Sequence, residues 1–172
     1  MYPRLKILFF CVSALVFIGC DRVTKDLAKE HLMNKAPVSY FHNTFRLVYT
    51  ENTGAAMGFA DNLPKAASFW LLSMLPLAFL VALSFYVIKY SKQMSVGKIF
   101  SFALIMGGGM GNIIDRILFD RHVSDFMNLG IGNIQTGIFN FADVCVTAGA
   151  IGLVLFYRDK KTNLRAEDIF NT

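Results

Sequence analysis

The sequence of 172 residues is poor in charge, cysteine and histidine, and each shortage narrows the possible chemistry. Its 3 cysteines form no CxxC pair, so they support neither a disulfide framework nor a zinc site. Its 3 histidines lack metal-ligand spacing, and no HExxH, P-loop or GxSxG motif is present. Signatures of metalloproteases, P-loop nucleotide-binding proteins and serine hydrolases are therefore missing.

Apolar residues dominate the remaining composition. Hydrophobic residues make up 55% of the chain, charged residues only 17%, and the mean hydropathy is +0.47. A soluble domain of this length needs a more polar surface, so the composition predicts a membrane protein. The net charge of +5 does not indicate nucleic acid, because the basic residues cluster beside apolar runs. Such clusters are typical of contact with anionic lipids, so we expect membrane lipids and no nucleic acid as partners.

Four charge-poor apolar segments predict four transmembrane helices in a single domain, residues 1–172. Only the segment 66–88 is long enough alone, because a membrane span needs roughly 20 apolar residues. The other three segments must include polar flanking residues. We place the spans at about 5–22, 66–88, 98–116 and 141–158.

Basic residues set the predicted orientation of these spans. The connection KYSKQMSVGK between the second and third spans holds three lysines and no acid, and both chain ends are basic. Cytoplasmic segments carry an excess of Lys and Arg, so we expect both termini and this connection on the cytoplasmic side. The segments at about 23–65 and 117–140 then lie outside the cytoplasm.

The two outer segments differ from ordinary hydrophilic loops. DRVTKDLAKEHLM continues the helical period beyond the first span, and Asp21 and Lys25 have the i,i+4 spacing of an ion pair. In FRLVYT, apolar and polar residues alternate over 45–50 as in a half-buried strand, and ENTG predicts a turn. The predicted fold is a membrane all-α bundle of four transmembrane helices, with a small extracytoplasmic β-sheet and a short surface helix.

The first twenty residues imitate a lipoprotein signal peptide. A basic start and an apolar run lead into FIGC, in which Gly19 precedes Cys20. Taken alone, this pattern predicts cleavage before Cys20 and lipid attachment to it. Two features speak against that interpretation: three more apolar segments follow, and Phe17 stands where Leu or Val is usual.

Five short motifs place polar side chains next to apolar segments. They are DRVTK, ENTGAAMG, GGGMGNIIDR, VSDF and FNFAD. All five fall on the predicted outer side of the membrane. Ionisable groups at membrane depth are costly and usually functional, so this coincidence predicts one functional site at that end of the bundle.

The motif GGGMGNIIDR has two compatible interpretations. Gly108, Asn112 and Arg116 recur every four residues and share one helix face, while Gly107 and Gly111 form a GxxxG that lets another helix approach. The motif is then either a packing surface, with Arg116 reaching to the headgroups, or a face that holds substrate or another polar group inside the bundle.

Two acids, Asp125 and Asp143, flank a segment without any charge. Asp143 begins the fourth apolar segment, where a carboxylate can cap backbone N–H groups, although Asn140 could do the same. If the outer segment folds back, the two carboxylates meet, and one keeps a proton while the other acts as a base. Such a pair can activate water for attack on a peptide carbonyl.

Rival groups for this chemistry remain in the sequence. Asp21 has Lys25 as a close partner, and Asp115 stands next to Arg116, although adjacent helical residues do not face each other. A pair of Ser124 and Lys25 is also conceivable but has no local signature.

The five motifs, in this order, resemble those of the bacterial lipoprotein signal peptidase (signal peptidase II) family from Asp21 to Asp143; Met57 departs from the usual Phe. The resemblance implies an aspartic endopeptidase of the bacterial inner membrane that works near the outer leaflet without metal or organic cofactor. It implies cleavage of diacylglyceryl-modified prolipoproteins just before the lipidated cysteine, with Asp125 and Asp143 as the catalytic pair. Supporting and substrate-binding residues would be Asp21, Lys25, Asn52, Gly54, Gly108, Asn112, Arg116 and Asn140.

Two other functions are weighed beside the peptidase. A small proton-coupled transporter would use buried Asp and Arg side chains as a relay, but the sequence lacks duplicated halves and its acids gather on one side. A non-catalytic lipoprotein or scaffold would carry lipid on Cys20. We expect the protein to act as a monomer.

Overall fold

The computed structural model describes residues 2–54, 64–131 and 134–157, so Met57 and the basic C-terminal tail lie outside the described part. The elements follow in the order α1 (Pro3–Leu32), β1 (Val38–Tyr40), β2 (Phe45–Asn52), α2 (Lys65–Phe69), η2 (Trp70–Met74), α3 (Leu75–Tyr90), η3 (Ser91–Gln93), α4 (Val96–Leu118), β3 (Val123–Ile131), β4 (Ile134–Gln135) and α5 (Phe141–Tyr157).

All four apolar segments are helical, but they are not equally long. Within the described residues, three helices are long and apolar enough to cross a membrane: Pro3–Leu32, Lys65–Gln93 and Val96–Leu118. The fourth, α5, has 17 residues and counts as a shorter apolar helix. At 1.5 Å per residue it covers roughly 25 Å of a hydrocarbon core about 30 Å thick. The predicted count of four full spans is therefore confirmed for three helices only.

Helix α1 continues well beyond the first apolar segment, as predicted. It runs without a break from Pro3 through Gly19 and Cys20 to Leu32, and no proline follows Pro3 within it. Cleavage before Cys20 would remove Phe10 and Ala14, which are both buried in the helical core. The structure therefore speaks against processing of this chain as a lipoprotein.

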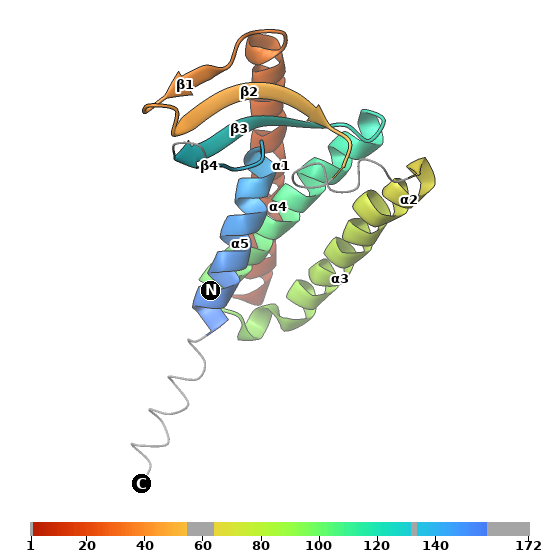
Figure 1. The fold of residues 1–172 in the computed structure, drawn as a ribbon. Coiled ribbons are helices and arrows are strands. Elements are labelled where there is room, and N and C mark those ends of the chain that lie inside the picture. The colour runs from red at the N-terminus through yellow and green to blue at the C-terminus, as the bar shows by residue number, and fades with distance from the viewer. Residues whose placement is uncertain (1, 55–63, 132–133, 158–172) are drawn as a thin grey trace.

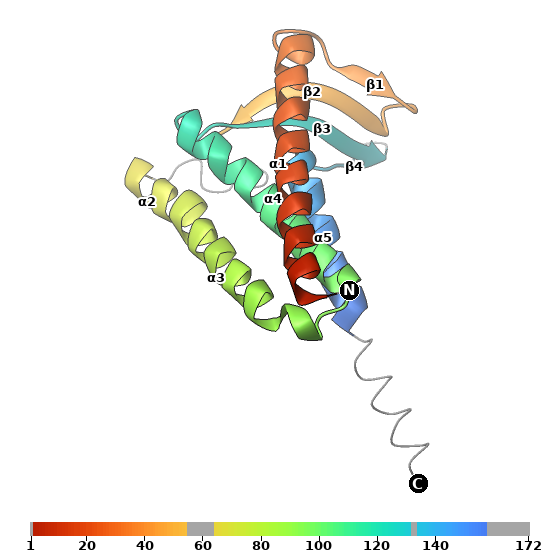
Figure 2. The same cartoon turned by 180° about the vertical axis from the view of Figure 1, so that it is seen from behind.

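Helix α4 lies between α3 on one side and α1 and α5 on the other (Figures 1 and 2). Its glycines allow this close packing. A Cβ atom at Gly107 or Gly111 would collide with α1, at Phe17 and Asp21 respectively. A Cβ atom at Gly108 would collide with the Ala142 carbonyl of α5. The predicted GxxxG packing surface is confirmed, and Gly108 serves packing on the α5 side.

The outer segments form one antiparallel sheet with the strand order β1-β2-β3-β4. The strand predicted over 45–50 is confirmed, but it continues to Asn52, so the turn expected at ENTG starts later. An extra residue of β2 between Leu47 and Thr50 shifts the pairing with β3. The described residues contain no separate surface helix beside this sheet; the outer end of α1 takes that place (Figure 1).

The sheet lies across one end of the helices, directly above the N-terminal end of α5 (Figure 1). Helix α1 passes along the sheet and contacts β2 and β3. Segments far apart in the sequence, from α1, β2, α4, β3 and α5, therefore meet at this end. These are the segments that carry the five polar motifs.

Candidate active site

The N-terminus of α5 is closed by a reciprocal pair of hydrogen bonds between Asn140 and Asp143. The Asn140 backbone N–H donates to Asp143 Oδ2 at 3.1 Å, and the Asp143 N–H donates to Asn140 Oδ1 at 3.1 Å. This is the geometry of a capping box, with each side chain satisfying a backbone group of the other. Asp143 does cap the helix as one interpretation proposed, but only one of its oxygens is used for the cap.

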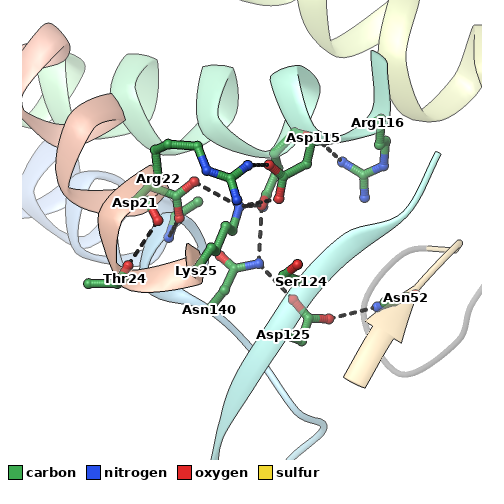
Figure 3. Close-up of polar contacts among 12 residues, drawn as sticks. Asp21, Arg22, Thr24, Lys25, Asn52, Asp115, Arg116, Ser124, Asp125 and Asn140 are labelled. Carbon is green, nitrogen blue, oxygen red and sulfur yellow. Dashed lines mark hydrogen bonds and ion pairs between the residues drawn. The ribbon is translucent and has the colours of Figure 1, made fainter. Parts of the chain in front are cut away.

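Asn140 also holds the second acid. Its side-chain Nδ2 donates to Asp125 Oδ1 at 2.7 Å (Figure 3). The other oxygen of Asp125, Oδ2, accepts from Asn52 Nδ2 at 3.0 Å. Asp125 is 3% exposed and Asn140 is fully buried. A single asparagine thus contacts both carboxylates.

Asn112 of α4 completes the arrangement. Its Nδ2 donates to Asp143 Oδ1 at 2.9 Å. Its Oδ1 accepts from Lys25 Nζ at 2.9 Å and from Asn140 Nδ2 at 3.1 Å. Two donors on one oxygen fix the orientation of the amide, so the amide N–H₂ must face Asp143. Each of the two carboxylates therefore accepts two hydrogen bonds: Asp125 from Asn52 and Asn140, and Asp143 from Asn112 and Asn140.

The environment of Asp125 raises its pKa to about 6. Burial is the largest cause, because it disfavours the charged carboxylate, and the nearby charge of Asp143 raises the pKa further. The hydrogen bonds from Asn52 and Asn140 act in the opposite direction. A pKa close to neutrality suits a group that must both hold and release a proton.

The acids open onto a largely apolar cavity of about 620 Å³ between α3, α4 and α5. Asn52, Asn112, Asp125, Asn140 and Asp143 lie in its wall. The rest of the lining is mostly apolar and includes Leu72, Phe79, Ile105, Ile113, Phe139 and Val146. The cavity can therefore hold an apolar ligand against two carboxylates.

Arg116 also lines this cavity, instead of extending to the headgroups. Its guanidinium donates to the Gly54 carbonyl at 3.1 Å and to the Asn112 carbonyl at 3.4 Å. Its Nε is buried and has no hydrogen-bond partner in the described part of the chain. Gly54 in turn donates its N–H to Asn52 Oδ1 at 2.9 Å, which orients the Asn52 amide toward Asp125.

A buried ion cluster lies behind Asn112. Lys25 is fully buried and contacts Asp21 at 2.7 Å and Asp115 at 2.9 Å (Figure 3). The second oxygen of Asp21 accepts from the Ala142 N–H of α5 at 2.9 Å. The predicted pair of Asp21 and Lys25 is confirmed. Lys25 pairs with both rival acids, and Arg22 supplies Asp115 with a second cation, which leaves Asp125 and Asp143 as the acids at the cavity.

Two details of the site were not predicted from the sequence. Arg22 of α1 donates to Asp115 of α4 at 3.0 Å and so joins the ion cluster. The local sequence indicates only the contact of Arg22 with Asp26, four residues along the same helix. The conceivable pair of Ser124 and Lys25 is wrong, because Ser124 Oγ contacts the Tyr49 hydroxyl at 3.1 Å instead. Among the described residues, no group of three or more His, Cys, Asp or Glu side chains is placed to hold a metal ion.

Comparison with known proteins gives one consistent result. The family model described as Signal peptidase (SPase) II matches residues 13–158. The chain is 40% identical over 159 residues to a lipoprotein signal peptidase of Chlorobium phaeobacteroides (strain BS1), covering 87% of this chain and 95% of that protein. It is 33% identical to a lipoprotein signal peptidase of Sulfurihydrogenibium sp. (strain YO3AOP1), covering 91% and 96%.

A solved structure supports the same assignment. A crystal structure described as a bacterial membrane enzyme superimposes with a TM-score of 0.74 at 25% identity, covering 90% of each chain. The sequence motifs, the sheet across the helix ends and these similarities agree. The chain belongs to the signal peptidase II family.

Proposed function

We propose that the protein is an aspartic endopeptidase that removes signal peptides from diacylglyceryl-modified prolipoproteins, cutting just before the lipidated cysteine. The observation that carries this proposal is the bridge made by Asn140, which hydrogen-bonds to both Asp125 and Asp143 in the wall of the apolar cavity. The family to which the chain belongs, and the names of its relatives, support a peptidase acting on prolipoproteins.

The two carboxyls act as a pair that shares one proton. The ionised carboxylate takes a proton from a water molecule while the water oxygen attacks the scissile carbonyl carbon. The protonated carboxyl donates its proton to the carbonyl oxygen, so a neutral tetrahedral intermediate forms. Its collapse breaks the C–N bond, restores the carbonyl and passes a proton to the leaving amine. The pKa values that govern these steps belong to the pair.

The surrounding residues position the pair and the substrate. Asn52, Asn112 and Asn140 hold the carboxylate oxygens in fixed directions. Arg116 lines the cavity near the pair and donates to the Gly54 carbonyl, which fixes the position of its guanidinium. The apolar lining suits the signal helix and the acyl chains that accompany it into the site.

The proposed location is the bacterial inner membrane, with the site near the outer leaflet and both termini in the cytoplasm. Support comes from the acid-free basic connection between the second and third spans and from the long apolar helices. We propose that the enzyme acts as a monomer, because all the residues of the pair and its supports belong to one chain. A transporter is not favoured: the buried charged residues of the described part, Asp21, Lys25, Asp115 and Asp125, gather at one end.

The test compares two catalytic substitutions with a matched control. Asp125→Asn and Asp143→Asn are each expected to abolish cleavage of a diacylglyceryl precursor in vesicles. Asp120→Asn removes an exposed acid between α4 and β3 and is expected to leave cleavage unchanged, since its carboxylate is 77% exposed. An unmodified precursor should remain uncut by every variant. Cleavage by either catalytic variant at the rate of the control would refute the pair.

A further inference from the structure

One end of the sheet has two chemically different faces. In the register of the strands, Tyr40 lies opposite Phe45, Phe45 opposite Leu129, and Ile131 opposite Ile134. Directly opposed residues, and residues two apart on one strand, share a face. We name this surface the apolar sheet face, and it consists of Val38, Tyr40, Phe45, Leu129, Ile131 and Ile134.

At this end of the sheet the reverse side is polar. Ser39, Arg46 and Asn128 lie opposite one another across the first three strands. Gln135 of β4 lies opposite Gly130 of β3 and continues this side. The end of the sheet is therefore amphipathic, with all its large apolar side chains on one face.

The apolar sheet face is open. Ile131 and Ile134 are 81% and 82% exposed, and Val38, Tyr40 and Leu129 are all more than two-fifths exposed. Phe41, in the turn that follows Tyr40, is 79% exposed and has a left-handed backbone with φ 50. The Gly130 N–H donates to the Thr44 carbonyl at 2.9 Å, so the two hairpin ends lie side by side. A contiguous exposed apolar surface of this kind indicates a contact with lipid or with another molecule.

The position of this surface favours lipid. In both views the hairpin ends project sideways beyond the outline of α1, α4 and α5 (Figures 1 and 2). A bilayer that surrounds those apolar helices extends under this overhang. Between Val38 and Val48 the only charged residue is Arg46, and Phe126–Ile131 has none, so no acid opposes an anionic headgroup layer.

The same surface is continuous with the active-site cavity. Met127, which precedes Leu129 by two residues on β3, pairs with Phe139 in an isolated bridge. Phe139 lines the cavity and directly precedes Asn140. The apolar residues at the end of the sheet and Asp125 lie on the same strand, β3. The membrane depth of that end therefore also determines the depth of Asp125.

We propose that the apolar sheet face, together with Phe41, inserts into the outer leaflet of the membrane as a lipid anchor. The anchor fixes the depth of β3 and so sets the height of Asp125 relative to the lipid-bearing cysteine of the substrate. The insertion itself requires no catalysis, so it can be tested separately from the peptidase mechanism.

The test measures the depth of single labelled positions in the full-length protein. The three cysteines are replaced by alanine, and a nitroxide is attached at Ile134→Cys or, as the matched control on the polar side, at Ser39→Cys. The protein is reconstituted in vesicles of phosphatidylcholine and phosphatidylglycerol. The label at 134 is expected to collide with a water-soluble nickel chelate at least about threefold less often than the label at 39, as for an interfacial apolar contact.

Three outcomes would overturn the proposal. Equal accessibility of the two labels would show that the face lies in water. Protection at 134 that grows with protein density would assign the face to a second copy of the chain. Protection that arises only after addition of a lipidated precursor would assign it to substrate. Failure of the catalytic pair would instead show as absent cleavage with the label at 134 still protected.

A second measurement tests the effect on cleavage. The double variant Ile131→Ser/Ile134→Ser is expected to cleave precursor more slowly than wild type in vesicles but equally fast in detergent micelles, where no leaflet sets the depth. Equal rates in vesicles would contradict the anchor. A loss of rate in both media would indicate damage to the fold and would also count against it.

Discussion

The contact of Asn140 with both acids predicts a shift in the pH dependence of cleavage. Asn140→Ala removes the 2.7 Å hydrogen bond to Asp125, which stabilises the ionised carboxylate. Because the carboxylate loses a donor, its pKa rises. Asp125 has the raised pKa and so keeps the shared proton, and the basic limb of the rate profile must therefore move to higher pH. A hydrogen bond to a charged group contributes about 1.5–3 kcal/mol. This energy corresponds to a rise of about one to two in the pKa that governs the limb, since each pKa unit is about 1.4 kcal/mol.

The assay is the pH profile of kcat/KM with a fluorogenic diacylglyceryl peptide in vesicles. Loss of the cap also weakens α5 by about 1 kcal/mol, so the profile is recorded well below the unfolding temperature. Asn128→Ala is the matched control. It removes another buried asparagine, on β3, the strand of Asp125, whose side chain donates to the Thr136 carbonyl rather than to either acid. The basic limb of its rate profile should stay in place. An unchanged or lowered limb in Asn140→Ala would refute the assigned role of this side chain.

Three further predictions follow from the buried groups and the helix packing. Lys25→Met leaves the buried Asp21 without its cation and Asp115 with Arg22, and it should lower the free energy of unfolding by about 3–5 kcal/mol. Thermal or denaturant unfolding measures this loss, and an unaltered midpoint would contradict the cluster. The pKa of Asp125 is raised from 3.8 to about 6 in the folded protein, so its contribution is complete below pH 3.8 and about 3 kcal/mol is lost as the pH rises through 6. Asp125→Asn should abolish that part of the pH dependence of unfolding, and a slope equal to wild type between pH 4 and 6 would argue against it. Gly108→Leu should prevent α5 from packing against α4 and yield little folded protein. Gly19→Leu should be tolerated, because nothing lies within 4 Å of its added Cβ. Similar yields of folded protein for the two variants would contradict the packing.

Local patterns in the sequence predicted much of the fold. The alternation over 45–50 predicted the strand β2, and the helical spacing after the first apolar segment predicted the continuation of α1. The GxxxG spacing predicted the packing face of α4. These features depend on neighbours within a few residues, so the sequence contains their cause. The end of β2 at Asn52 was missed, because its last residues are held by β3 rather than by their own pattern.

The candidate site could be predicted only as a set of residues. Which asparagine would contact both acids depends on how β3 lies over α5, and that arrangement is fixed by contacts across the whole chain. The bond from Asp21 to the Ala142 N–H joins groups 121 residues apart. The role of Arg22 was missed for the same reason, since its partner Asp115 belongs to another helix.

The pairing of Asp21 with Lys25 has a consequence for biosynthesis. Both groups lie on α1, so the lysine meets a neutralising carboxylate as soon as the first helix is made, long before Asp115 leaves the ribosome. Asp143, in contrast, belongs to α5, the last helix of the described chain. The nascent protein can therefore enter the bilayer with the charge of Lys25 already compensated, whereas the proposed catalytic pair is complete only after the last described helix has been made.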